Sequence, residues 1–299
     1  MSEQREKEDL AVFESHRPAL VGLAYRMLGD VGRAQDMVQE AWLRWHRRAV
    51  EVETPRAFLV TVVTRLCLNE LDSARARREE SRSDRLPEPV NLEAGGLSRV
   101  EELEELSMAI LVVLERLTPA ERAVLLLHEV FDFPHEEIAT LVSRTPAACR
   151  KLLERARQRV AEGRRLITAS PEDHRRLLDA FLRAASAGDV AALKELLAAD
   201  AVLITDGGPE GRAFQGVRNL RRPLEGAAQV AAFVAATSRR AELEVQPREL
   251  NGQPALVFYR EAQPFAAVLL AVAEGKIQRV FFHADVSRLR YLGHGRHRH

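Results

Sequence analysis

The stretch that decides the fold is Thr118–Arg159, TPAERAVLLLHEVFDFPHEEIATLVSRTPAACRKLLERARQR. Apolar residues recur there at spacings of three and four, which predicts helices over 119–132, 135–142 and 146–160. Ser143-Arg144-Thr145 forms a tight turn between the last two. Two short helices joined by a turn of three or four residues form a helix-turn-helix, whose second helix enters the major groove of DNA. The stretch therefore predicts a DNA-binding module.

The second helix of this motif begins with small residues, and basic residues follow them. Alanines there allow close approach to a groove, arginine or lysine next reaches guanine edges or phosphates, and later arginines neutralise the DNA backbone. The alternative is a solvated basic face of an ordinary helical bundle. The capping, the turn length and the order of small and basic residues together favour DNA binding. The predicted DNA-contacting residues of the motif are Arg144, Thr145, Ala147, Ala148, Arg150, Lys151 and Arg155.

A hydroxyl residue followed by proline marks four helix starts. These pairs are Thr54-Pro55, Thr118-Pro119, Thr145-Pro146 and Ser170-Pro171. The hydroxyl accepts a hydrogen bond from an otherwise unpaired amide, and proline has no amide to leave unpaired. Glu121, three residues after Thr118, completes a capping box. We therefore expect helices to begin at the four prolines.

Outward from this stretch, charge and periodicity divide the chain into five segments. Residues 1–82 predict three packed helices, 83–117 a proline-containing linker and an acidic helix, and 118–165 the helix-turn-helix. Residues 170–290 predict an α+β domain, and 291–299 a disordered tail. In the α+β domain, helices over 172–187 and 190–198 precede strands over 201–205, 242–245, 255–259, 265–273 and 277–282. Asn251-Gly252 predicts a tight hairpin, since both residues tolerate positive φ.

Composition excludes several classes of protein. The 299 residues carry 44 Lys plus Arg and 44 Asp plus Glu, so the formal net charge is zero, which excludes a uniformly basic protein that coats nucleic acid. No apolar run reaches the roughly 18–20 residues that cross a bilayer, and the first ten residues resemble no signal peptide. Cys67 and Cys149 are the only cysteines, which excludes a disulfide framework and a cysteine-based zinc cluster. We expect a cytoplasmic protein with no membrane contact, metal or cofactor.

Two segments resemble a known family. Gly32–Trp45, GRAQDMVQEAWLRW, resembles the core-binding helix of extracytoplasmic-function sigma factors. Thr118–Arg122 and the helix-turn-helix after it are similar to the promoter-reading domain of the same family. The resemblance spans two modules in the correct order, over roughly the first half of the chain. It implies two partners, the RNA polymerase core enzyme and promoter DNA.

The resemblance also implies roles for individual residues. Asp36, Gln39, Glu40 and Arg44 would bind the clamp helices of polymerase, although on their own they form an ordinary solvent face. The loop 47–55 and the start of the third helix would open and hold the minus-ten element, while Pro146–Arg157 would read the minus-thirty-five element. Phe58 is a candidate for stacking on an unpaired base, but core packing is the favoured interpretation. Further along the third helix, the residues expected to meet promoter DNA are Asn69, Asp72, Arg75, Arg77 and Arg78.

The C-terminal region resembles a SnoaL-like domain, a cone related to ketosteroid isomerase, which a subgroup of these sigma factors carries. Arg85–Pro89 resembles the linker motif Trp-Leu-Pro-Glu-Pro of this subgroup, with Arg85 in place of tryptophan, and Asp206 begins a match to its Asp-Gly-Gly-Gly-Lys motif. The resemblance implies that the cone governs sigma activity in cis, and we predict a contact between the linker and the Asp206 loop. The regulatory residues implied are Pro87, Glu88, Pro89, Asp206, Gly207 and Gly208.

Other interpretations remain open at this point. A ligand-responsive DNA-binding regulator that never joins polymerase is the main alternative, and the Asp36–Trp45 face distinguishes the two. The cone is a candidate site for an unidentified small ligand. An isomerase-like enzyme would use Asp206, Tyr259, His283 or Asp285, but no spacing establishes a catalytic pair, and we expect no enzyme. The expected fold is multidomain, with two all-α domains followed by an α+β SnoaL-like cone.

Overall fold

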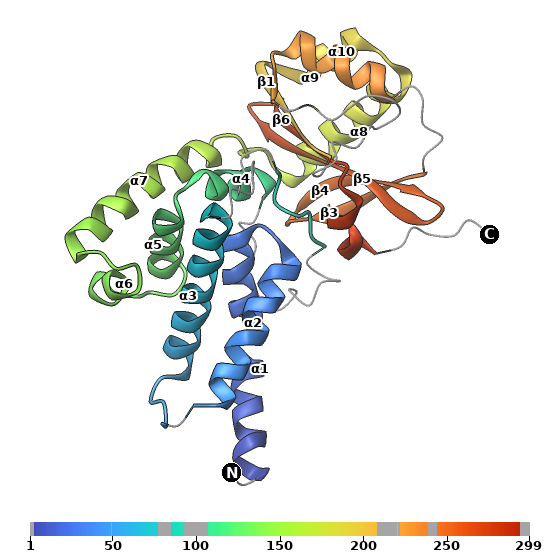
Figure 1. The fold of residues 1–299 in the computed structure, drawn as a ribbon. Coiled ribbons are helices and arrows are strands. Elements are labelled where there is room, and N and C mark those ends of the chain that lie inside the picture. Colours follow the sequence, from blue (N-terminus) through green and yellow to red (C-terminus); the bar gives the residue numbers. More distant parts are fainter. Residues whose placement is uncertain are drawn as a thin grey trace. The chain divides into compact units, whose positions relative to one another are not determined.

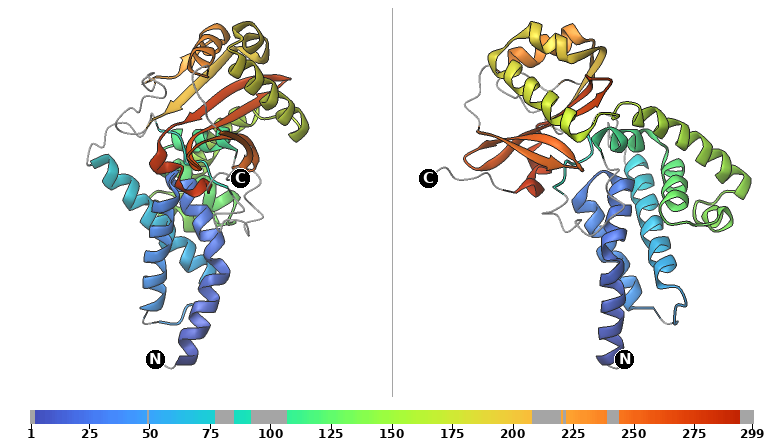
Figure 2. Two further views of the ribbon diagram at one scale, coloured as in Figure 1. Left: turned by 90° about the vertical axis from the view of Figure 1, so that its right-hand side faces the viewer. Right: turned by 180° about the vertical axis from the view of Figure 1, so that it is seen from behind.

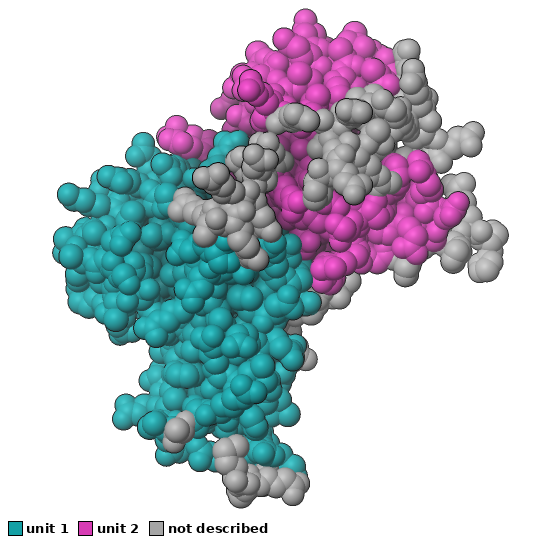
Figure 3. Space-filling model, in the orientation of Figure 1, with its two compact units in different colours: residues 1–80, 96–103, 113–160 teal, residues 81–95, 104–112, 161–299 magenta. Residues whose placement is uncertain are grey.

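The computed structural model describes residues 3–48, 50–76, 85–91, 107–207, 220, 222–238 and 244–293. The chain forms two compact units, coloured separately in Figure 3. Unit 1 takes in residues 1–80, 96–103 and 113–160, and unit 2 takes in 81–95, 104–112 and 161–299. This division differs from the five segments expected from charge and periodicity. The N-terminal helices and the helix-turn-helix share one unit, and the proline-containing linker belongs with the C-terminal region.

The regular secondary structure among the described residues of unit 1 is helical (Figure 1). Its helices are α1 (Glu3–Leu28), α2 (Val31–His46), α3 (Pro55–Ala76), α5 (Pro119–Glu129), α6 (His135–Leu141) and α7 (Pro146–Arg164), of which the last residues of α7 belong to unit 2. A further helix, α4 (Met108–Arg116), runs across the boundary between the units in the sequence. The three N-terminal helices pack on one another, and α5 packs on α1 and α3.

The amphipathic pattern of α2 shows why these helices associate. Its buried residues recur at spacings of three and four: Val31, Ala34, Val38, Ala41 and Trp45. Such a stripe lies on one side of a helix and is stable only when another apolar surface covers it. Asp30 caps the start of α2, where its carboxylate accepts the amide of Arg33 at 2.8 Å.

The four helix starts marked by proline are confirmed. The helices α3, α5, α7 and α8 (Pro171–Ala187) begin at Pro55, Pro119, Pro146 and Pro171. Thr118 and Glu121 form the predicted capping box, with the Glu121 amide donating to Thr118 Oγ1 at 3.2 Å and the Thr118 amide donating to Glu121 Oε2 at 3.0 Å. Each cap satisfies amides that the helix itself leaves unpaired.

Unit 2 is an α+β fold, which confirms the expected fold class. Its elements after α8 are α9 (Val190–Leu196), β1 (Leu197–Asp206), β2 (Leu224–Glu225), α10 (Ala227–Ser238), β3 (Glu244–Leu250), β4 (Gln253–Arg260), β5 (Gln263–Ala273), β6 (Lys276–His283) and the short 3-10 helices η3 (Val286–Arg288) and η4 (Arg290–Leu292). The sheet order is β2-β1-β6-β5-β4-β3, with β1 parallel to β6 and every other neighbour antiparallel. Asn251 at φ 52° and Gly252 at φ 67° form the predicted hairpin turn between β3 and β4.

Different elements pack on the two faces of this sheet. Alternate residues of β5 face opposite sides: Val268 and Leu270 pack with α8, α9 and α10, which Figures 1 and 2 show lying along the sheet. Ala267 and Leu269 pack in a second core. That second core contains Leu86, Met108, Ala109, Leu289 and Leu292, so residues of the linker, of α4 and of the 3-10 helices complete it.

Four elements were not predicted. The strand β2 and the helix α10 lie between residues 206 and 242, where no helix or strand was expected, and the 3-10 helices η3 and η4 follow the last expected strand. The helix α10 reads AAQVAAFVAATS, and its alanine content is the signal that would have identified it. Over the part of the chain that the structure describes, no helix has both the length and the apolar character needed to span a bilayer.

Candidate functional site

The helix-turn-helix is built from α6 and α7. Ile138 and Ala139 of α6 and Cys149 and Leu153 of α7 are buried, so each helix turns an apolar side to the protein interior. Ser143 adopts φ 53° in the turn, a left-handed conformation that glycine occupies most easily. This conformation lets the Arg144 amide donate to the Ala139 carbonyl at 2.9 Å, which closes the turn without a glycine.

The start of α7 presents the predicted DNA-contacting residues. The exposed members of that set are Arg144, Thr145, Ala147, Arg150, Lys151 and Arg155, and Ala148 is half-buried. Thr145 Oγ1 accepts the Ala148 amide at 3.2 Å and so caps the helix. A helix N-terminus carries partial positive charge, which adds to that of the basic side chains at a phosphate backbone.

The later arginines of α7 have partners inside the domain. Arg157 Nη2 lies 2.6 Å from Glu129 Oε1, and Arg159 Nη1 lies 3.1 Å from Glu121 Oε2. These two guanidinium groups therefore also contact α5. Both arginine side chains are about half exposed, so their expected contact with the DNA backbone stays a prediction. The partners are 28 and 38 residues away in the chain, so no local pattern reveals them.

The outer face of α2 carries the residues implied to bind polymerase. Asp36, Gln39 and Arg44 are exposed and Glu40 is half-buried. Glu40 Oε1 and Arg44 Nε are 2.9 Å apart, an ion pair one helical turn long. An exposed pair of this kind contributes at most a few tenths of a kcal/mol to folding, so the face is chemically available to a partner.

The helix α3 carries some of the second DNA-contacting set. Asn69 and Asp72 are exposed along it. Arg77, Arg78 and the side chain of Arg75 lie outside the described residues. The Phe58 ring is half-buried, with its centroid 5.8 Å from that of Trp45, which supports core packing for this aromatic residue.

Arg122 of α5 is a buried cation that the sequence analysis did not single out. It is 5% exposed, and its guanidinium donates to the Met27 carbonyl at the end of α1. Burial lowers its pKa, while the negative charge of Glu115 acts in the opposite direction. Arg122 thus joins the helix-turn-helix region of unit 1 to its N-terminal helices.

In unit 2, the segment Leu86–Val90, here called the strap, is buried along its whole length. The Leu86 amide donates to Asp206 Oδ2 at 3.1 Å, and the Val90 amide donates to Asn251 Oδ1 at 3.2 Å. The Asn251 amide returns a bond to the Val90 carbonyl at 2.8 Å. The predicted contact between the linker and Asp206 is therefore present, and the hairpin residue Asn251 provides a second anchor that the sequence analysis missed.

Arg288 links the strap to β1 electrostatically. Its Nη1 lies 2.9 Å from Asp206 Oδ2, and its Nε lies 3.6 Å from Glu88 Oε1. All three side chains are at most 10% exposed. Pro87, Pro89 and Gly207 are buried beside them, and Gly208 lies outside the described residues. Two buried carboxylates share one guanidinium, so removing that cation leaves an uncompensated buried charge.

The four residues considered for catalysis are buried in the core or engaged in hydrogen bonds within unit 2. Tyr259 is 1% exposed in the second core, and Asp285 caps η3 by accepting the Ser287 amide at 3.1 Å. His283 sits beside Asp206 on adjacent strands. Burial, with a smaller contribution from the positive charge of Arg288, lowers the pKa of His283 to about 3. The Asp206 carboxylate accepts from Arg288 and from the Leu86 amide.

No group of three or more potential metal ligands occurs among the described His, Cys, Asp and Glu residues. Cys67 and Cys149 are both buried, and burial raises their pKa values above that of an ordinary thiol. The histidines of the C-terminal tail, His294, His297 and His299, lie outside the described residues of the chain.

Comparisons with known proteins identify this arrangement. The family described as Sigma-70 region 2 matches residues 12–77, which carry most of α1 and all of α2 and α3. Sigma-70, region 4 matches residues 107–160, which carry α6 and most of α7. These two regions define a transcription initiation factor.

Full-length relatives specify the family. The chain is 33% identical to "Probable ECF RNA polymerase sigma factor SigI" of Mycobacterium tuberculosis, over 90% of this chain and 91% of that protein. It is 39% identical to the ECF RNA polymerase sigma factor SigJ of the same organism, over 71% of this chain and 69% of SigJ. A crystal structure of SigJ aligns with a TM-score of 0.71 at 30% identity, covering 94% of this chain and 98% of that one. The chain belongs to the ECF RNA polymerase sigma factors.

Proposed function

We propose that this sigma factor binds the clamp helices of the RNA polymerase core through the outer face of α2 and brings the core to promoters read by α7. The observation that carries the proposal is which residues of α2 are buried and which are exposed. Its apolar stripe is buried in the helical core, while Asp36, Gln39 and Arg44 are exposed on the opposite side. A polar face with weak internal pairing is suited to a specific, reversible protein interface.

The test is core binding after charge reversal. Asp36→Arg combined with Glu40→Arg should weaken binding of the full-length protein to purified core by at least tenfold. Asp179→Arg, a charge reversal at an exposed position of α8, is the matched control and should leave affinity unchanged. Intact polymerase binding by the double variant would instead favour a regulator that acts without joining polymerase.

For promoter DNA, we propose that α7 reads the minus-thirty-five element and that the loop 47–55 with α3 holds the opened minus-ten element. Support comes from the exposed basic start of α7, where Arg150 and Lys151 follow a capped helix N-terminus. Asn69 and Asp72 provide exposed polar groups along α3. Strand opening carries a cost of a few kcal/mol for each base unstacked, which bound polymerase and these contacts together would offset.

We also propose that unit 2 governs sigma activity in cis through the strap. The strap lies in the sequence between α3 and α5, so every path along the chain from one DNA-contacting region to the other passes through it. Its backbone is held by Asp206 and Asn251, and its Glu88 by Arg288. Once the packing of α5 on α1 and α3 is broken, holding or releasing the strap would change how far the two regions can separate along a promoter.

This proposal needs a test gentler than truncation, because Leu86 contributes to the second core of unit 2. Asn251→Gly keeps the positive φ of the hairpin turn but removes the side-chain acceptor for Val90. Glu274→Gly changes another turn residue with positive φ, at 54°, and serves as the control. The first variant should change promoter-dependent transcription at least twofold and the second should not. Equal output from both would contradict regulation through the strap.

Regarding catalysis and location, we propose that unit 2 has no enzymatic turnover and that the protein works in the cytoplasm, where its polymerase acts. A ligand in the cone remains a candidate regulator. The engagement of Asp206 with Arg288 supports the absence of turnover, since a catalytic base needs a carboxylate accessible to substrate. Turnover of a ketosteroid by the full-length protein, lost on His283→Gln, would contradict this.

A further inference from the structure

Two histidines near the helix-turn-helix form a stacked pair that the sites described above do not include. His128 lies in the last turn of α5, and His135 is the first residue of α6. Their ring centroids are 4.8 Å apart at an interplanar angle of 26°. Both residues are half-buried, so a ligand in the solvent can still reach the pair.

The connection between α5 and α6 fixes this stack. Phe131 and Phe133 are 4% and 8% exposed, so they anchor the connection in the apolar interior. Between them, Asp132 is exposed and adopts φ 58°, a left-handed conformation that aspartate tolerates better than most residues. The Phe133 amide then donates to the Leu127 carbonyl at 3.0 Å. The chain is thus turned back and holds the two rings together.

The surroundings of His135 favour the neutral form of its ring. Its Nδ1 is buried and has no hydrogen-bond partner among the described residues. A charged imidazole carries a proton on both nitrogens, so this nitrogen would become an unpaired buried donor. Burial lowers the pKa of His135, and the positive charges of Arg150 and Arg157 on α7 lower it further. His128 acts in the same direction, and Glu136 of α6 acts in the opposite one.

The carboxylate beside His128 is shared with a cation. Glu129 Oε1 lies 3.2 Å from His128 Nδ1, and the same oxygen lies 2.6 Å from Arg157 Nη2. A carboxylate that already pairs with a guanidinium compensates a second positive charge only in part. The protonation of the pair therefore depends on any further negative charge that comes close to α7.

Promoter DNA is a source of such charge. Figure 1 shows α6 next to the start of α7. Arg150 is exposed there and is one of the residues expected to contact promoter DNA. A duplex carries one negative charge per ~1.7 Å of its axis, so its phosphates would offset the effect of Arg150 on the neighbouring imidazole. A nearby opposite charge favours the charged form of a titratable group.

We propose that the stacked pair of His128 and His135 takes up a proton from the solvent when α7 binds promoter DNA, so that promoter affinity increases as the pH falls below neutral. The proposal rests on the proposed function, because the phosphates belong to the promoter that α7 reads. The two rings share one proton, since two stacked imidazolium groups would repel each other.

The direction of the effect follows from linkage. The pair binds its proton more tightly in the DNA complex than in the free protein. The gain in affinity is therefore complete below the pKa of the free protein and is lost as the pH rises through the pKa of the complex. One proton changes the affinity by up to about tenfold for each pH unit between these two values.

The first test measures promoter affinity against pH. Fluorescence anisotropy of promoter DNA with the assembled holoenzyme should show at least about fivefold tighter binding at pH 6 than at pH 8. The variant His128→Gln with His135→Gln should reduce this difference to less than about twofold. His174→Gln replaces a buried histidine of α8, serves as the matched control and should keep the full difference.

A fixed charge separates proton binding from a structural role. The guanidinium of His135→Arg stays charged at every pH used. This variant should bind promoter DNA at pH 8 at least about twofold more tightly than the unsubstituted protein, and its affinity should change little with pH. If the pair only packs the connection between α5 and α6, the same variant should bind more weakly at every pH, which would contradict the proposal.

A calorimetric measurement needs no substitution. Titration of the holoenzyme with promoter DNA near pH 7, in phosphate and in Tris, should give different apparent enthalpies, because the two buffers release a proton with different heats. The difference should correspond to uptake of a fraction of one proton. Equal enthalpies in both buffers would show that no proton is taken up.

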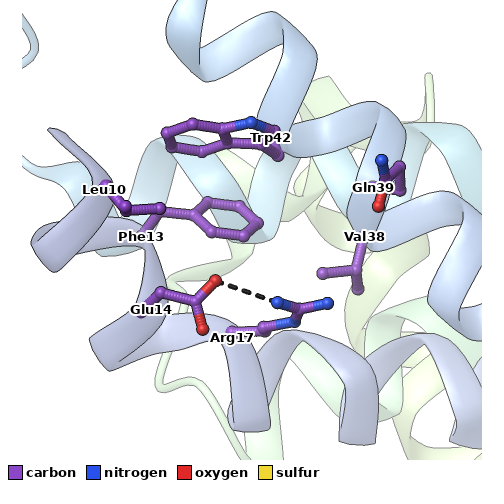
Figure 4. A pocket seen from close by; sticks show the side chains of 7 residues that line it. All are labelled: Leu10, Phe13, Glu14, Arg17, Val38, Gln39 and Trp42. Atoms are coloured by element: carbon purple, nitrogen blue, oxygen red, sulfur yellow. Dashed lines mark hydrogen bonds and ion pairs between the residues drawn. The ribbon is translucent and has the colours of Figure 1, made fainter. Parts of the chain in front are cut away.

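Core binding provides an internal control. The recess between α1 and α2 in Figure 4 adjoins the α2 face, and none of the residues that line it is a histidine. Histidine is the side chain that ordinarily titrates between pH 5 and 8. Affinity of the full-length protein for purified core should therefore change less than about twofold between pH 6 and pH 8, so the larger change arises at the DNA step.

The outcomes separate the two proposals. If the unsubstituted holoenzyme binds no promoter DNA at any pH, the proposed function fails. If it binds equally well from pH 6 to pH 8, or if His128→Gln with His135→Gln keeps the pH dependence of the unsubstituted protein, only the histidine proposal is overturned.

Discussion

Arg288 and Asp206 form an ion pair of 2.9 Å between residues 82 positions apart in the chain. The same Asp206 oxygen accepts the amide of Leu86 at 3.1 Å. One buried carboxylate thus connects the first strand of the sheet, the 3-10 helix η3 and the strap.

This connection predicts a large loss of stability when the carboxylate is removed. Asp206→Ala should lower the free energy of unfolding by about 3–5 kcal/mol, because it leaves the Arg288 guanidinium buried without one of its anions. Urea unfolding of the full-length protein measures the change. The double variant Asp206→Ala with Arg288→Met should lose at least about 1 kcal/mol less than the sum of the two single variants. Simple additivity would show that the two side chains do not interact energetically.

Acid should destabilise unit 2 through its buried histidine. The folded-state pKa of His283 is about 3, below the ordinary 6.5, so between these pH values the unfolded chain binds more protons than the folded one. The stabilising effect of the neutral imidazole is therefore complete above pH 6.5 and is lost as the pH falls towards 3, at about 1.4 kcal/mol for each pH unit.

His283→Gln should flatten that dependence between pH 6 and about 4, as measured by urea midpoints at several pH values. The pKa of His174 is also lowered, to about 4, mainly by burial. His174→Gln should therefore reduce the pH dependence of the unfolding free energy by a similar amount. A pH dependence that neither substitution changes would contradict this assignment.

The turn of the helix-turn-helix should accept glycine. Ser143 holds φ 53°, and a non-glycine residue in the left-handed region carries a penalty of about 1 kcal/mol. Ser143→Gly should raise the free energy of unfolding of the full-length protein by about 0.5–1 kcal/mol, although the added freedom of the unfolded chain offsets some of the gain. Ser143→Val should lower it, and a lower stability for the glycine variant would mean that the serine side chain supports the turn.

Promoter affinity should depend on the first basic residues of α7 more than on its last ones. Arg150→Ala should cost about 1–3 kcal/mol of promoter binding if it reads a base, or reduce the salt slope by about 1 if it contacts a phosphate. Arg157→Ala is the matched control, because its guanidinium is already 2.6 Å from Glu129. Fluorescence anisotropy of promoter DNA with the assembled holoenzyme, at several salt concentrations, distinguishes these outcomes.

Local sequence was sufficient to predict the helix starts, the helix-turn-helix and the Asn251-Gly252 hairpin. Each depends on contacts within a few residues, such as the bond from the Glu121 amide to Thr118. The polar face of α2 was also visible, because its buried stripe repeats with the helical period. The resemblance to sigma factors then assigned roles that those patterns alone did not contain.

Long-range pairings were not predictable in the same way. Nothing local to Arg122 indicates that it would bond the Met27 carbonyl, 95 residues away. The burial of the strap depends on Asn251, which is 161 residues from Val90. Such contacts follow from the tertiary fold and not from composition or period.

The central claim is that this chain brings polymerase to promoters and binds the core through the α2 face. The most direct measurement is run-off transcription from a cognate promoter by purified core supplemented with the full-length protein. We predict promoter-specific transcripts with the unsubstituted protein and with Asp179→Arg, and at least a tenfold loss with Asp36→Arg combined with Glu40→Arg. Equal transcription by all three proteins would contradict the account. So would a complete lack of transcripts with the unsubstituted protein at promoters to which it binds through α7.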